Sequence, residues 1–279
     1  MQCFSLNVYE GRSDVTLKVY LKDFQGSEGP DHSCPAVLVL PGGGFFGHIE
    51  REGEPVALYF TALGYQAFVL EYSVGIMSRM PNPIVDTAKA IALMRARAKA
   101  WGIDPHRVVS VGFGSGAFMP SFIAYSAMLS NNGFGRVKAL MSPAEASIVN
   151  SMDAKPNVVV LVNPMIEIDE VIERLEKLGE PGQHQGLMLR NLLFGEARSV
   201  DVHEEKAAAN DLLIPSEQMS ALGVWESEAY LLSSPMATRR LIECLKQSQV
   251  HLCQKILPEV GVDIHWAIEV DRWIKSVFD

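Results

Sequence analysis

Short, continuously apolar runs that alternate with helical patterns constrain the fold of this chain more than any other feature. The runs AVLVL at 36–40 and NVVVLV at 157–162 lack polar alternation, so each is predicted to be a strand buried on both faces. Between them, IVDTAKAIALMRARAKAWG at 84–102 has apolar residues at every third or fourth position, as in a helix packed on a sheet. This alternation predicts an α/β fold with a mostly parallel central sheet and helices on both faces.

The length of the chain and its periodicity predict one domain. A chain of 279 residues, 48% of them hydrophobic, can bury one large core, so we expect a single domain over 1–279. Glycine, histidine and charged residues intermix from 180 to 215, where the periodicity weakens. We therefore expect a small cap or excursion above the sheet over about 165–215.

The charge balance argues against polyanionic partners. Lys and Arg total 24 against 33 Asp and Glu, and the net charge of -9 would repel nucleic acid and anionic membrane surfaces. The first residues, MQCFSLNVYEGRSD, show no export signal, and no run of eighteen apolar residues occurs. The expectation is a soluble, cytoplasmic protein; a homo-oligomer is left open.

The cysteines and histidines predict neither a disulfide framework nor a metal site. Four scattered cysteines form no C-x-x-C pair, and seven histidines show no H-x-x-x-H or H-x-H spacing. The run GFGSG at 112–116 lacks the third glycine of a dinucleotide fingerprint at the required offset. We expect reduced thiols, no metal and no cofactor.

The sequence VVSVGFGSGA at 108–117 has the frame of a nucleophile elbow. In that motif, G-x-S-x-G, a serine stands midway between two glycines at a sharp turn from strand to helix. Here Gly112 and Gly116 flank a third glycine, Gly114, and the only hydroxyl nearby belongs to Ser115. An elbow serine is held at a strained backbone angle that glycine adopts freely, so Gly114 is expected at positive φ. We expect the Ser115 hydroxyl to cap the first helical turn.

Further candidate positions follow the other strands, because functional residues of such sheets lie at the carboxyl ends of their strands. In LPGGGFFGHIEREGEP at 40–55, consecutive glycines leave backbone N–H groups open to a ligand. An acid and a histidine would come from WESEAYLLSSP at 225–235 and LPEVGVDIHW at 257–266. By contrast, Asp86, on a helix face that looks exposed, and Asp104, before a proline, are expected to be structural.

These motifs carry a family resemblance. VLVLPGGGFFGHIEREGEPVALYFTALGYQAFVLEYSVG, from residue 37, and WGIDPHRVVSVGFGSGA, from residue 101, resemble the bacterial acetyl-esterase and lipase group of the α/β-hydrolase superfamily, the acetylxylan-esterase-like proteins. The match is dense over 36–117 and thinner beyond. The resemblance implies the α/β-hydrolase fold, and it implies carboxylic-ester hydrolysis only if the catalytic positions match.

The catalytic positions do not match. Laid over the family's elbow, the sequence places Gly114 at the nucleophile. Laid over the family's paired aspartates, the sequence places Ala229 and Tyr230 at those two positions. At the position of the family's catalytic histidine it places Val262. Glycine and valine supply neither a lone pair nor a proton for this chemistry. The resemblance therefore implies a degenerate triad at Gly114, Tyr230 and Val262.

What the resemblance leaves is the oxyanion hole, formed by the N–H groups of Gly43, Gly44 and Ser115. Alone, such a hole gives only about 10³–10⁴-fold acceleration over water. We therefore expect a pseudo-esterase, with ester hydrolysis lost or much impaired, that binds a small-molecule ester, acyl or carboxylate ligand or a partner.

An alternative interpretation is an active esterase whose nucleophile and base are displaced from the usual positions. Ser115 would act as nucleophile, His265 as its base, and Glu228 would orient the histidine. Three coordinated shifts would be needed. The residue after the nucleophile normally turns its side chain away from the substrate, and His265 stands where the last helix begins.

Overall fold

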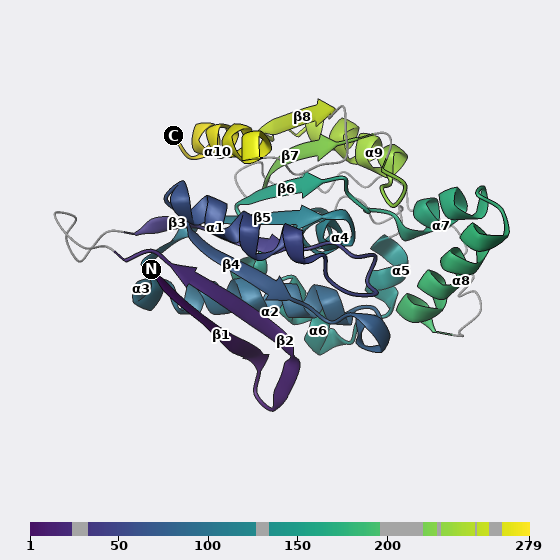
Figure 1. The fold of residues 1–279 in the computed structure, drawn as a ribbon, viewed down its shortest axis with the longest axis horizontal. Coiled ribbons are helices and arrows are strands. Elements are labelled where there is room, and N and C mark those ends of the chain that lie inside the picture. Colours follow the sequence, from purple (N-terminus) through teal and green to yellow (C-terminus); the bar gives the residue numbers. More distant parts are fainter. Residues whose placement is uncertain (24–32, 127–133, 196–219, 228–229, 249, 257–263) are drawn as a thin grey trace.

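The computed structural model describes residues 1–23, 33–126, 134–195, 220–227, 230–248, 250–256 and 264–279. Its described strands form one eight-stranded sheet in the order β1-β2-β4-β3-β5-β6-β7-β8 (Figure 1). The strands are β1 (Gln2–Tyr9), β2 (Arg12–Leu21), β3 (Cys34–Leu40), β4 (Gln66–Glu71), β5 (Ile103–Phe113), β6 (Val158–Val162), β7 (Ala221–Glu226) and β8 (Leu252–Ile256).

The sheet is parallel except at one edge. The hairpin β1–β2 joins β4 in antiparallel orientation, and every pairing from β4 to β8 is parallel. Since parallel strands need crossover connections, helices follow most of them. The predicted mostly parallel sheet is confirmed.

The helices include four short 3₁₀ turns, η1 to η4, within the described part of the chain. None of the helices described there combines the length and the apolar character needed to cross a bilayer. The helical elements are η1 (Glu50–Glu52), α1 (Glu54–Ala62), η2 (Gly75–Ser78), α2 (Asn82–Ala96), α3 (Ala98–Trp101), η3 (Gly114–Ala117), α4 (Phe118–Tyr125), α5 (Phe134–Ala139), α6 (Pro143–Val149), η4 (Met152–Ala154), α7 (Ile168–Glu176), α8 (Glu180–Phe194), α9 (Pro235–Lys246) and α10 (Ile264–Phe278).

Two hydrophobic cores cover the two faces of the sheet. Strand β3 shows the division, because Leu38 packs into the core beneath α2, α4 and α9, and Val39 packs into the core beneath α1 and α10. Successive side chains of a strand point to opposite faces, so a continuous apolar run fills both cores. The strands predicted at 36–40 and 157–162 are therefore present, and the helix predicted at 84–102 is present as two helices, α2 and α3, which are separated at Arg97.

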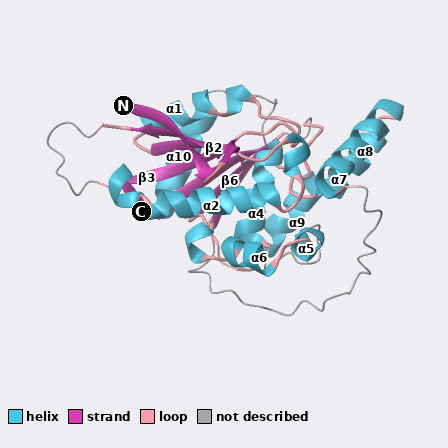
Figure 2. Cartoon of the chain, turned by 90° about the horizontal axis from the view of Figure 1, so that it is seen from below, coloured by secondary structure: helices cyan, strands magenta, loops and turns pink. Residues whose placement is uncertain are grey.

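The expected cap region begins with two regular helices. Helices α7 and α8 form a hairpin that follows β6 and projects beyond the sheet (Figures 1 and 2). The sequence pattern from 180 onward looked weak, but α8 is a regular helix of 15 residues whose buried positions include Leu189 and Leu193. The remainder of the expected cap, 196–219, lies outside the described residues.

The burial of Asp86 differs from what the sequence predicted. Asp86 was expected on an exposed helix face, but it is buried, because the β1–β2 hairpin covers this part of α2. The Tyr9 hydroxyl donates to Asp86 Oδ1 at 2.6 Å and the Ser73 N–H donates to Oδ2 at 2.9 Å. Asp104 accepts from the His106 N–H at 2.9 Å, as a turn residue does. Both aspartates are structural.

Candidate functional site

The predicted turn from strand to helix is present at Gly114. Strand β5 ends at Phe113, Gly114 has a φ of +49°, and η3 leads directly into α4. The flanking glycines allow close packing, since a Cβ at Gly116 would lie 2.1 Å from the Leu40 carbonyl oxygen, and one at Gly112 would lie 2.5 Å from the Gly116 oxygen. The expected positive φ at Gly114 is confirmed.

Tyr230 lies against the bare backbone of Gly114. A Cβ added at Gly114 would find the Tyr230 hydroxyl oxygen at 3.5 Å and the Cα of Gly42 at 3.9 Å. Burial, and then the charge of Glu52, raise the pKa of Tyr230 above its ordinary value, so its hydroxyl keeps its proton at neutral pH. The structure thus brings two of the predicted positions together across 116 residues of sequence.

The glycine run after β3 forms a compact loop. The Gly42 carbonyl accepts from the Ile49 N–H at 3.0 Å, and the Gly43 carbonyl accepts from the Phe46 N–H at 3.1 Å. A Cβ at Gly43 would lie 2.2 Å from the Gly47 carbonyl oxygen, so only glycine fits there. Within the described ranges, the N–H groups of Gly43 and Gly44 have no hydrogen-bond partner.

Glu52 is a site residue that sequence reasoning missed. It closes η1, is only 7% exposed, and its Oε2 accepts from the Gly42 N–H at 2.9 Å. Burial raises the pKa of Glu52, while the Gly42 N–H and the neighbouring Arg51 act against that rise. The signal in the sequence was a carboxylate in the loop of REGEP, before Gly53 and Pro55. We call Gly42–Gly44, Glu52, Gly114, Ser115 and Tyr230 the Gly114 site.

The side chain of Ser115 points to Tyr72. Ser115 is 1% exposed, and its Oγ lies 3.4 Å from the Tyr72 hydroxyl oxygen. The single Tyr72 proton goes to the Pro41 carbonyl at 2.6 Å, so Ser115 donates to Tyr72. The expected helix cap by Ser115 is wrong, because its Oγ contacts the Tyr72 hydroxyl and accepts from no backbone N–H of the first turn among the described residues. The Ser115 N–H has no partner among the residues that the structure describes.

The other predicted positions are not tested by this geometry. Val262, Ala229 and Glu228 lie outside the described residues. His265 is in the first turn of α10, and its side chain is not described. The displaced arrangement and the third triad position therefore stay predictions.

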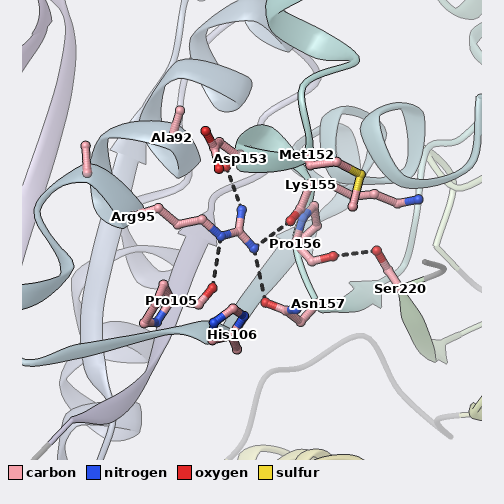
Figure 3. Close-up of a pocket in the computed structure, with 11 residues that line it drawn as sticks. Ala92, Arg95, Pro105, His106, Met152, Asp153, Lys155, Pro156, Asn157 and Ser220 are labelled. Carbon is pink, nitrogen blue, oxygen red and sulfur yellow. Dashed lines mark hydrogen bonds between the residues drawn. The ribbon is translucent and has the colours of Figure 1, made fainter. Parts of the chain in front are cut away.

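A cavity of about 540 Å³ lies at the opposite end of the sheet, at the amino ends of β6 and β7 (Figure 3). The Arg95 guanidinium lies in its wall and donates to the carbonyls of Pro105, Asp153 and Lys155 and to Asn157 Oδ1, at 2.6–3.1 Å. Four of the five guanidinium protons are thereby used within the fold. The guanidinium in the wall of this amino-end cavity is therefore engaged within the fold.

Parts of the chain are similar in sequence to two curated proteins. Over 91 residues the chain is 34% identical to endo-1,4-beta-xylanase B of Butyrivibrio fibrisolvens, a match covering 32% of this chain and 14% of that protein. Over 141 residues it is 27% identical to the acetylxylan esterase of Xylanibacter ruminicola, covering 48% of this chain and 23% of that protein. The matches thus span less than a quarter of either relative.

Solved structures show the same fold along the whole chain. MGS-M1, an α/β hydrolase enzyme from a Medee basin deep-sea metagenome library, matches with a TM-score of 0.68 and 21% identity, over 100% of this chain and 98% of that one. The acetyl ester-xyloside bifunctional hydrolase of Caldicellulosiruptor lactoaceticus matches with a TM-score of 0.69 and 22% identity, over 99% and 96%.

The model of the BD-FAE family matches residues 22–171, more than half of the chain. This segment contains the glycine loop, Glu52 and the elbow. The predicted α/β-hydrolase fold and the predicted resemblance to the acetyl-esterase group are confirmed, and the chain belongs to the BD-FAE family.

Proposed function

We propose that this esterase-like α/β hydrolase is a pseudo-esterase, whose ester hydrolysis is lost or much impaired and whose Gly114 site binds an ester, acyl or carboxylate ligand. One observation carries the proposal. Where the elbow would present a serine, the chain has Gly114 at a φ of +49°, and the Tyr230 hydroxyl lies 3.5 Å from where a side chain would begin.

The chemistry of an acyl-enzyme cannot start at this position. Hydrolysis through a covalent intermediate needs a hydroxyl nucleophile and a base within about 3 Å to take its proton. Gly114 has no side chain, and the adjacent hydroxyl of Ser115 donates to Tyr72. The open N–H groups of Gly43, Gly44 and Ser115 can still receive a carbonyl or carboxylate oxygen, so binding is retained where bond cleavage is not.

The setting proposed for this function is the cytoplasm. All four cysteines, which lie in described parts of the chain, are free thiols. Free thiols are usual in a reducing compartment. The net charge of -9 supports a small-molecule ligand rather than nucleic acid.

Hydrolysis of p-nitrophenyl acetate by the purified chain tests the proposal. The expected rate is no more than about 10⁴-fold above the uncatalysed reaction, which is the acceleration that an oxyanion hole gives by itself. The rate should not change after treatment with a serine-directed fluorophosphonate. A turnover number of about 1 s⁻¹ or more that this reagent abolishes would overturn the proposal.

A further inference from the structure

Two polar groups of the Gly114 site have unused hydrogen-bonding capacity. Glu52 Oε2 is held by the Gly42 N–H at 2.9 Å, but Glu52 Oε1 has no partner in the described part of the chain. The hydroxyl of Tyr230 likewise has no partner among the described residues, although it lies beside Gly114. The two groups are close enough for the Glu52 charge to raise the pKa of Tyr230. A carboxylate and a hydroxyl with unused capacity therefore lie close together beside Gly42 and Gly114.

We propose that Glu52 and Tyr230 select the ligand, so that the Gly114 site binds a neutral acyl compound, an ester or an amide, and rejects the free carboxylate. The inference rests on the proposed function, because it names the ligand class of that same site. The carbonyl oxygen of the ligand accepts from the Gly43 and Gly44 N–H groups and from the Tyr230 hydroxyl. Gly43 and Tyr230 are each partly exposed, so a ligand can reach them from solvent.

The selection against carboxylates follows from the burial of Glu52. Glu52 is 7% exposed, so little water screens its charge from a ligand bound beside it. Two carboxylates at such a site cannot both stay ionised without a large energetic penalty. A neutral carbonyl brings no charge, and an amide N–H can also donate to the open Oε1 of Glu52. The site would thus hold an uncleaved ester or amide and reject the acid that hydrolysis releases.

The groups around Glu52 predict how this selection changes with pH. Burial raises the pKa of Glu52, while the Gly42 N–H and Arg51 favour its charged form. Tyr72 and Tyr230, the tyrosines that sense its charge, have pKa values above their ordinary value and stay neutral below pH about 8. As pH falls towards the raised pKa, Glu52 takes up a proton and no longer repels an anion. Carboxylate affinity should therefore increase as pH falls, and amide affinity should stay nearly constant.

Benzamide and benzoate, which have nearly the same shape, test the inference. In titrations of the full chain at about pH 8, followed by NMR, benzamide should bind at least about 10-fold more tightly than benzoate. Glu52→Gln can still accept from the Gly42 N–H, and it should bring the two affinities within about 2-fold, mainly through tighter benzoate binding. Glu50→Gln, which removes an exposed carboxylate from the same 3₁₀ turn, is the matched control and should leave the ratio unchanged.

Two further measurements separate selection from folding. As the pH is lowered from about 8, within the range in which benzoate stays ionised, benzoate affinity should increase in the unaltered chain and in Glu50→Gln. It should stay flat in Glu52→Gln. Tyr230→Phe should weaken both probes about 5-fold without changing their ratio, because it removes one hydrogen bond to the carbonyl group. The pH series on the unaltered chain needs no variant to fold.

The outcomes distinguish this inference from the proposed function. Equal affinities in the unaltered chain at about pH 8, or a preference for benzamide that survives Glu52→Gln, would overturn the selection and leave ligand binding in place. If neither probe binds, both proposals are wrong. Fast, serine-dependent ester hydrolysis together with the expected selectivity would overturn the pseudo-esterase proposal alone.

Discussion

The two ends of the sheet differ in how far their polar groups are hydrogen-bonded within the fold. At the amino-end cavity, the Arg95 guanidinium donates to four acceptors of the fold. At the Gly114 site, the Tyr230 hydroxyl, Glu52 Oε1 and the N–H groups of Gly43 and Gly44 have no partner in the described ranges. Gly43 and Tyr230 are partly exposed, so water can satisfy them in the free protein, and their unused capacity is available to the ligand that we propose.

Cavity size is a poor guide to the position of the proposed binding site in this molecule. The amino-end cavity of about 540 Å³ is roomy, but its strongest donor is already engaged within the fold. The Gly114 site is defined by its open donors and acceptors and by a backbone that only glycine adopts easily. The comparison therefore predicts that changes at the amino-end cavity affect stability, and that changes at the Gly114 site affect binding.

Arg95→Met should produce the largest loss of stability. The variant leaves three carbonyls and the Asn157 side chain without their charged donor, so the free energy of unfolding should fall by about 3 kcal/mol. Denaturant unfolding measures this loss, and Lys99→Met, which changes an exposed cation nearby in the sequence, is the control. Benzamide binding at a temperature where Arg95→Met is folded should be unchanged. If Arg95→Met keeps its stability but loses benzamide binding, the amino-end cavity binds the ligand and the prediction is wrong.

Gly114→Ser should have a smaller effect on stability and almost none on catalysis. The backbone at a φ of +49° should cost a serine about 1–2 kcal/mol, although a Cβ has room because its nearest neighbour would be at 3.5 Å. Thermal unfolding measures the expected decrease in Tm. Esterase activity should stay near background, since a serine needs its base, and it should increase more than additively only with Val262→His and Tyr230→Asp. Fast hydrolysis by Gly114→Ser alone would show that a base is already in place.

The sequence could predict the features that depend on local patterns. The apolar runs at 36–40 and 157–162 fill both faces of the sheet, and the glycine at the midpoint of the elbow has the positive φ that the motif requires. Both features follow from side-chain periodicity and from the backbone freedom of glycine, which are visible within about ten residues.

The features that the sequence could not predict depend on contacts between distant segments. Asp86 is buried because Tyr9, on the hairpin at the edge of the sheet, reaches it across 77 residues. Tyr230 was identified only as a mismatch to an aspartate, and its contact with Gly114 depends on how the loop after β7 is folded. The carboxylate of Glu52 turns inward because η1 brings it to the Gly42 N–H. No local periodicity carries such information.

Ser115→Ala should have the smallest effect, and it tests whether the Gly114 site contains a displaced nucleophile. The hydroxyl makes one long contact, 3.4 Å to Tyr72, whose own bond to Pro41 does not depend on it, so the loss of stability should be at most about 1 kcal/mol. The residual rate of p-nitrophenyl acetate hydrolysis should stay within a few-fold of that of the unaltered chain. His265→Ala should likewise leave this rate within a few-fold. A displaced nucleophile and base would instead lose about 10³-fold or more from either change and no more from both, because they act as one unit. That non-additive loss would make Ser115 the nucleophile, and the open groups around Gly114 would then belong to an active esterase.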